Sequence, residues 1–168
     1  MLPTAIAVAP NGGRKVKADH PAVPLTAAEL AFTAARCFDA GASMIHAHVR
    51  TADGLHLLDA DAYREAIAAI RGAVGDKLII QITSEALGQY TPAEQRAVVQ
   101  AVKPEAASLA LRELVPGAGE EKAFSDLLGW MKRESVTPQI ILYDVSDAIR
   151  LAELQTRGLI PFDRVNGS

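Results

Sequence analysis

The sequence predicts an α/β fold of the (β/α)8 TIM-barrel type, of which about the first five β/α units are present. Short apolar runs alternate strictly with longer amphipathic stretches, as expected for parallel strands joined by helices. Each repeat is roughly 30 residues long, and a full barrel needs roughly 250 residues. The 168 residues therefore form one predicted domain, residues 1–168. A complete five-stranded α/β sheet is the alternative that fits the same alternation.

Five short runs, each bounded by Gly, Pro or polar residues, are the predicted strands. They are largely apolar, which is typical of parallel strands that are covered on both faces. They span Thr4–Ala9, Ser43–Val49, Lys77–Ile82, Ala106–Leu109 and Gln139–Leu142.

The stretches between these strands begin with helix-start signals. Thr26 and Glu29 have the spacing of a capping box, and so do Thr91 and Glu94. Pro92 then falls at the first helical position, where its missing N–H costs nothing. Further helices are predicted over Asp61–Ala73, Glu120–Glu134 and Val145–Thr156. Left-handed C-terminal caps are expected at Gly41, Gly75 and Gly158.

The composition excludes several classes of protein. The net charge is −3 and no basic run with interleaved aromatic residues occurs, so nucleic acid is not an expected partner. No stretch approaches the roughly 20 apolar residues of a membrane span. The single cysteine, Cys37, forms no disulfide within the chain and is predicted to be a small core residue. The cytoplasm is the expected location.

Two histidines, His46 and His48, stand one residue apart in the second predicted strand, within the run SMIHAHVR. Side chains at i and i+2 of a strand point to the same face. Two imidazoles on one face, at the carboxyl end of a barrel strand, favour a zinc site over a packing role. Possible third ligands are Glu85, Glu113 and Asp144, and no spacing singles one out. The other histidines, His20 and His56, are expected in solvated loops.

Polar residues also follow the other predicted strands, at the edge where sites form in both architectures. Thr83 follows the third strand and Ser108 lies in the fourth. The turn after the first strand, Asn11-Gly12-Gly13, lacks the GxGxxG spacing of a dinucleotide site and is more typical of an ordinary turn. Arg14, Lys15 and Lys17 then form either a solvated loop or a rim that steers a phosphate or carboxylate.

Five stretches of the chain together resemble the β-keto acid cleavage enzyme family, whose best-known type is 3-keto-5-aminohexanoate cleavage enzyme. They are APNGGRKVKADHPAVPLTAAEL, GASMIHAHVR, IIQITSEALGQY, PEAASLALREL and PQIILYD. HAHVR after a Gly-Ala pair, and the NGG segment before the first helix, are the most specific. The resemblance extends to about Phe162.

The resemblance implies a (β/α)8 barrel, commonly tetrameric, with one Zn²⁺ at the carboxyl face. It also implies a reaction of a β-keto acid with acetyl-CoA that yields acetoacetate and a new acyl-CoA. His46 and His48 match two zinc ligands. Thr83 and Ser108 match hydroxyl residues that contact the keto acid, so they are the expected catalytic and substrate-binding residues.

Asn11 and Arg14, in the NGGR turn, are the other expected substrate-binding residues. The position of Arg14 is a glutamate in the aminohexanoate type, where it suits a substrate ammonium group. An arginine there repels an amine and accepts a neutral or anionic tail, so the amino-keto acid is not an expected substrate.

The third zinc ligand of the family, a late glutamate, and an Arg/Asp pair fall in a segment that this chain lacks. The chain is thus expected to be C-terminally shortened, with exposed strand edges that favour a homo-oligomer. Two rival interpretations stay open. One is an inactive barrel fragment that serves as an assembly or binding module. The other is a different zinc-dependent barrel lyase or hydrolase.

Overall fold

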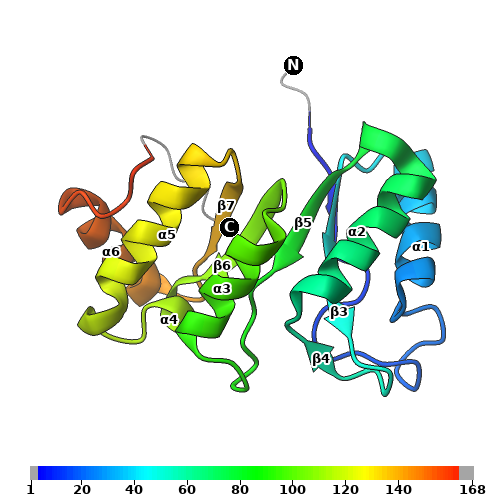
Figure 1. The fold of residues 1–168 in the computed structure, drawn as a ribbon, viewed down its shortest axis with the longest axis horizontal. Helices are drawn as coiled ribbons and strands as arrows, with labels where there is room; N and C mark the ends of the chain where they lie inside the picture. The colour runs from blue at the N-terminus through cyan, green and yellow to red at the C-terminus, as the bar shows by residue number, and fades with distance from the viewer. Residues whose placement is uncertain (1–3, 163–168) are drawn as a thin grey trace. The chain divides into compact units, whose positions relative to one another are not determined.

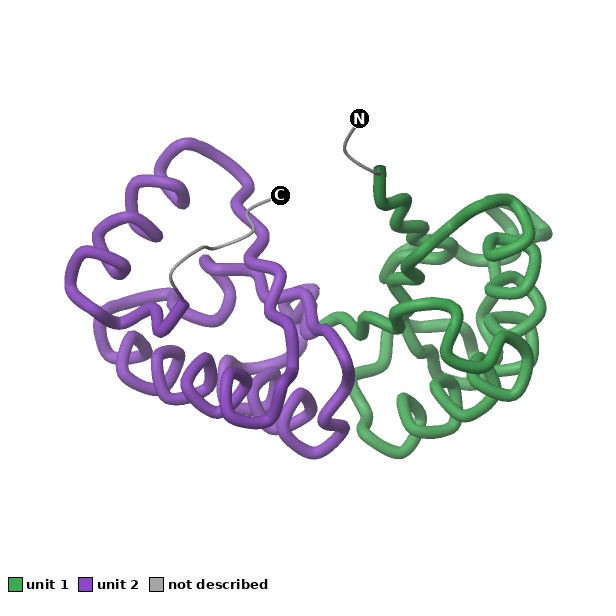
Figure 2. The backbone as a smooth tube through the Cα atoms, turned by 90° about the horizontal axis from the view of Figure 1, so that it is seen from above, with its two compact units in different colours: residues 1–83 green, residues 84–168 purple. Residues whose placement is uncertain are grey.

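The computed structural model describes residues 4–162. The chain divides into two compact units, residues 1–83 and 84–168 (Figure 1, Figure 2). Each unit combines parallel strands with helices, which confirms the predicted α/β class. Within the described residues, every helix is too short or too polar to serve as a membrane span.

The first unit contains three parallel strands in the order β1 (Ala7–Val8), β2 (Met44–Ala47) and β5 (Ile79–Thr83). Two helices, α1 (Ala27–Asp39) and α2 (Ala60–Val74), pack side by side (Figure 1). Each buries an apolar stripe, as its periodicity predicts. The buried residues are Leu30 and Ala34 of α1 and Tyr63, Ala66, Ile70 and Val74 of α2.

A hairpin of β3 (Val49–Arg50) and β4 (His56–Leu57) was not predicted. The continuous strand expected to Val49 is wrong at its end, because parallel pairing stops at Ala47 and the chain then enters the hairpin. The expectation of a solvated His56 is also wrong. His56 is 4% exposed, and its ring centroid lies 5.9 Å from that of His48.

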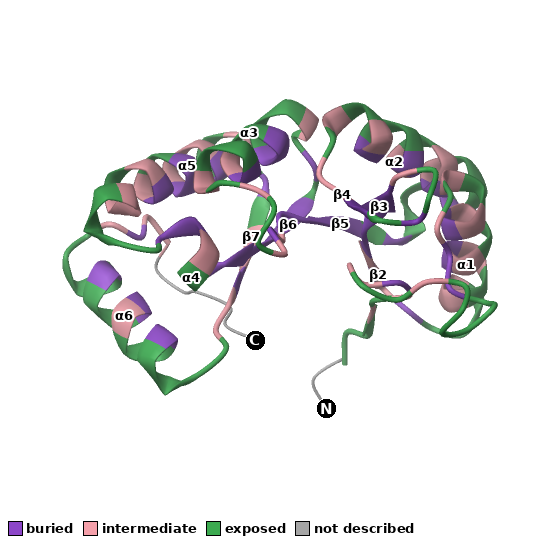
Figure 3. Cartoon of the chain, turned by 90° about the horizontal axis from the view of Figure 1, so that it is seen from below, coloured by how far each residue is buried: buried purple, intermediate pink, exposed green. Residues whose placement is uncertain are grey.

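The second unit contains the parallel pair β6 (Ala106–Ala110) and β7 (Thr137–Ile141). Its helices are α3 (Pro92–Val102), α4 (Leu111–Leu114), α5 (Glu121–Arg133) and α6 (Val145–Thr156). Every residue of β6 is buried (Figure 3). The predicted start of the last strand, Gln139, is wrong by two residues, because β7 begins at Thr137. Pro138 obscures this start in the sequence, since proline lacks the N–H that a ladder uses.

The predicted helix starts are confirmed. Both capping boxes form, with the hydroxyls of Thr26 and Thr91 accepting from the backbone N–H three residues on. The three predicted cap glycines have positive φ: 100° at Gly41, 59° at Gly75 and 72° at Gly158.

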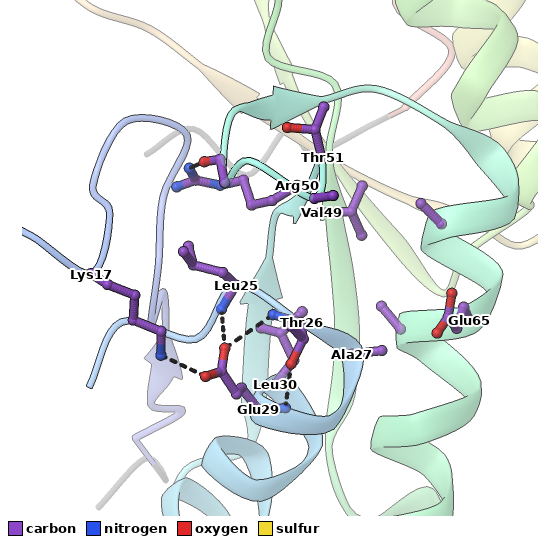
Figure 4. A pocket seen from close by; sticks show the side chains of 14 residues that line it. Lys17, Leu25, Thr26, Ala27, Glu29, Leu30, Val49, Arg50, Thr51 and Glu65 are labelled. Carbon is purple, nitrogen blue, oxygen red and sulfur yellow. Dashed lines mark hydrogen bonds and ion pairs between the residues drawn. The ribbon is translucent and has the colours of Figure 1, made fainter. Parts of the chain in front are cut away.

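Glu29 in the first box gives a pH prediction (Figure 4). Its carboxylate accepts from the backbone N–H of Leu25 and lies 2.6 Å from the Lys17 ammonium. The Lys17 hydrogen bond and then the Leu25 bond lower the pKa of Glu29 from 4.5 to about 2. The unfolded chain therefore binds more protons between these values, and stability rises with pH there. We expect Glu29→Gln to cost about 0.5 kcal/mol at pH 7.

Urea unfolding of Glu29→Gln and the parent chain, measured from pH 7 to pH 2, checks this. The difference in free energy of unfolding between the two proteins should be largest above pH 4.5, decrease as the pH falls, and vanish near pH 2. Glu94→Gln is the matched control, because Glu94 is the same position of the second box and its pKa is lowered by Thr91 without a lysine. An effect of Glu29→Gln no larger than that of Glu94→Gln would contradict the prediction.

Candidate metal centre

His46 in β2 and His48, the residue directly after this strand, face each other, as their spacing predicted. Their Nε2 atoms lie 3.0 Å apart and their ring centroids 4.9 Å apart. Two ligands 2.0–2.1 Å from a tetrahedral zinc ion are roughly 3.3 Å from each other. His46 and His48 are therefore close to a chelating arrangement.

Gln81 fixes the orientation of His46. It lies opposite His46 in the register of β2 and β5, and its Oε1 is 2.7 Å from His46 Nδ1. A carbonyl oxygen only accepts, so Nδ1 carries the proton and Nε2 keeps a lone pair directed to the His48 side. Sequence reasoning missed Gln81, although a glutamine between isoleucines in the predicted strand was a usable signal.

Both imidazoles are held in the form that binds metal. Burial lowers the pKa of His46. Burial, followed by the charges of His46, His56 and Arg50, lowers the pKa of His48 to about 3. Both rings are thus neutral at pH 7, and a neutral imidazole is the metal-binding state.

Asn11 and Thr83 are two other residues predicted for the first unit. Asn11 is buried, and its side-chain amide hydrogen-bonds to the main chain of His48. Thr83 is buried at the end of β5, where its carbonyl oxygen accepts from the hydroxyl of Tyr63 at 3.1 Å. Their contacts with substrate stay predictions.

Arg14 differs from its basic neighbours, Lys15 and Lys17, in its ion pairing. Lys15 pairs with Asp19 at 3.4 Å and Lys17 pairs with Glu29 at 2.6 Å. Arg14 is exposed and forms no ion pair with the residues that the structure describes. Of the three cations in the predicted rim, Arg14 is therefore the one available to an anion.

Ser108 belongs to the second unit. It is buried in the middle of β6, and its carbonyl oxygen accepts from the hydroxyl of Ser84 at 2.8 Å and from the Ser84 N–H at 3.2 Å. These bonds tie the main chain of β6 at Ser108 to Ser84. The role of the Ser108 hydroxyl stays a prediction.

The three acidic residues considered as third ligands also lie in the second unit. One carboxylate oxygen of Asp144 caps α6 and the other pairs with Arg112, so this carboxylate has a structural role. Hydrogen bonds from Ser146 and Arg112 hold the pKa of Asp144 well below its usual range. Glu113 accepts from the N–H of Ala86 at 2.9 Å. Among residues 4–162, no group of three or more His, Cys, Asp or Glu side chains forms a metal cluster.

Comparison with known protein families identifies the family of this chain. The model of the beta-keto acid cleavage enzyme family matches residues 3–166. This chain belongs to that family. The resemblance predicted from HAHVR and the NGG segment is confirmed.

Two curated relatives of this family member are named as an acetyltransferase and as a cleavage enzyme. It is 28% identical to the 3-oxoadipate:acetyl-CoA acetyltransferase of Cupriavidus necator, over 94% of this chain and 56% of the relative. It is 32% identical to the 3-keto-5-aminohexanoate cleavage enzyme of Acetoanaerobium sticklandii, over 84% of this chain and 54% of the relative. The chain spans about half the length of the curated relatives it matches.

Solved structures support the fold of this family member. A ternary complex of ObcA with a C4-CoA adduct and oxalate superposes with a TM-score of 0.71 at 16% identity, covering 88% of this chain and 37% of ObcA. The amine oxidase HisD of Pseudomonas geniculata N1 gives a TM-score of 0.52 at 15% identity, covering 84% of this chain and 26% of HisD. At these identities the likeness concerns the fold alone.

The residues of this family member fit the zinc ion that the resemblance implies. Two neutral imidazoles converge through Nε2, and a hydrogen-bond acceptor sits behind one of them. Imidazole nitrogen is a preferred zinc ligand, and a hydrogen-bond acceptor for the other ring N–H is the usual support.

Proposed function

We propose that this chain forms the metal-binding part of a zinc-dependent β-keto acid cleavage enzyme. The reaction joins a β-keto acid to acetyl-CoA and yields acetoacetate and an acyl-CoA. The bond between the keto carbon and the methylene group breaks, and the methylene carbon bonds to the acetyl carbon. The thioester passes from the acetyl group to the released acyl group, so the exchange needs no oxidant or reductant.

The convergence of His46 and His48 supports this proposal most directly, because family membership alone does not require a working site in this chain. Zinc, when bound, supplies Lewis-acid polarisation of a carbonyl oxygen. His46 and His48 hold the ion, and Gln81 keeps His46 in the ligating tautomer. Thr83 and Ser108, by resemblance, orient the keto acid through their hydroxyls.

Arg14 supports a substrate whose tail is neutral or negatively charged. One relative is named for 3-oxoadipate, a keto acid with a second carboxylate. With acetyl-CoA as the second substrate, we expect kcat/KM for 3-oxoadipate to be at least about tenfold higher than kcat/KM for 3-keto-5-aminohexanoate. In Arg14→Glu we expect the preference to be reversed, with kcat/KM roughly tenfold or more higher for the amino-keto acid. Acetoacetate formation with the two keto acids measures both.

Lys15→Glu is the matched control, since it makes the same charge change one residue away at a side chain paired with Asp19. It should leave the preference unaltered. An unchanged preference in Arg14→Glu would refute the role of Arg14. Turnover of a β-keto acid without any need for acetyl-CoA would favour another zinc-dependent lyase or hydrolase. A zinc-free chain without turnover would favour an inactive assembly module.

A further inference from the structure

Arg50, the last residue of the run HAHVR, is a buried cation that binds main-chain carbonyls of two loops. It is 8% exposed. Its guanidinium donates to the carbonyl oxygens of Gly12 and Lys15 in the loop after β1, the latter at 3.0 Å. It also donates to the carbonyl of Gly54 at 2.6 Å, in the turn of the β3–β4 hairpin. One side chain therefore ties the loop after β1 to the hairpin.

Asn11, at the beginning of the same loop, binds the main chain of His48 on both sides. Its Nδ2 donates to the carbonyl of His48 at 2.8 Å, and its Oδ1 accepts from the N–H of His48 at 3.2 Å. Nδ2 also donates to the carbonyl of Pro24 at 3.0 Å. These hydrogen bonds engage both donors and the acceptor of the amide with the main chain.

His48 lies where such support matters. The register of β2 with β5 ends at Ala47, and the register of the hairpin begins at Val49. His48 is therefore the residue between two sheets, outside both ladders. Its peptide groups are held by Asn11, whose loop is in turn held by Arg50.

We propose that Arg50 and Asn11 are positioning residues for the imidazole of His48 as a metal ligand. They act in series, with Arg50 holding the loop and Asn11 holding the peptide of His48. The proposal rests on the zinc site proposed above. This role accounts for an arginine at position 50, because a planar guanidinium with five donors can bind carbonyls of two loops at once, whereas a lysine ammonium cannot.

The test compares Arg50→Lys with Arg36→Lys, the same change at an exposed arginine of α1. Zn²⁺ affinity is measured by chelator competition, and the visible spectrum of the Co²⁺-loaded protein reports ligand geometry. Unfolding of the metal-free proteins in urea shows that each variant is folded under assay conditions. We expect Arg50→Lys to weaken Zn²⁺ binding roughly 10–100-fold and to change the Co²⁺ spectrum. Arg36→Lys should change neither.

Asn11→Asp provides a second variant if Arg50→Lys does not fold. It keeps the size and the acceptor for the His48 N–H but loses both donors, and the same loss of Zn²⁺ affinity is expected. Folded variants with the parent affinity and spectrum would overturn the positioning role while leaving the zinc site intact. A parent chain that binds neither Zn²⁺ nor Co²⁺ would refute the zinc site itself, and this role with it.

Discussion

Replacing His46 with alanine is expected to remove zinc from the chain and abolish any acetyl-CoA-dependent turnover. The variant leaves His48 as the sole imidazole of the pair and leaves Gln81 with no ring to orient. Changing a residue that merely supports a ligand costs 10–100-fold in metal affinity, so loss of a ligand costs more than about 100-fold. Zinc per chain after dialysis, measured by elemental analysis, should fall from near one to near zero.

His20→Ala is the matched control for this experiment, because His20 is an exposed loop histidine whose Nδ1 only accepts from the Ala22 N–H. It should keep the zinc content of the parent. Zinc retained in His46→Ala, or lost equally in both variants, would contradict the assignment of the metal site.

The periodic parts of this fold could be predicted from the sequence. Residues Val145–Thr156 form α6 as expected, and α5 ends one residue inside its predicted range at each end. Helix-start signals are local, since a capping box is formed by residues three apart. The signal that places His46 and His48 on one face is equally local, because side chains two residues apart in extended chain point to the same side.

The supporting residues of the site could not be predicted in the same way. Gln81 is 35 residues from His46, and Asn11 is 37 residues from His48. A strand pattern states which face a side chain occupies but not which residue of the next strand stands beside it. The burial of His56 depends likewise on the pairing of two two-residue strands, which are too short to leave a pattern.

Replacing Phe124 with alanine is expected to have the largest effect on stability. Phe124 is 1% exposed and belongs to the buried stripe of α5, with Leu127, Leu128 and Met131. Truncating a buried phenylalanine removes apolar contacts and leaves a cavity, at a cost of about 3–5 kcal/mol. The midpoint of urea unfolding should fall by roughly 1–3 M. Trp130, the only tryptophan of the chain, lies in the same helix, so its fluorescence follows this unit directly.

Phe32→Ala separates burial from the other consequences of this substitution. Phe32 lies in α1 and is 65% exposed, with Arg36 5.7 Å from its ring centroid. Both variants gain the same helix propensity from alanine, so their difference reports burial alone apart from an exposed cation–π contact worth about 0.5 kcal/mol. The unfolding midpoint of Phe32→Ala should stay within about 0.5 M of the parent. If Phe124→Ala shifted the midpoint no further than Phe32→Ala, the apolar stripe of α5 would not be the core that stabilises its unit.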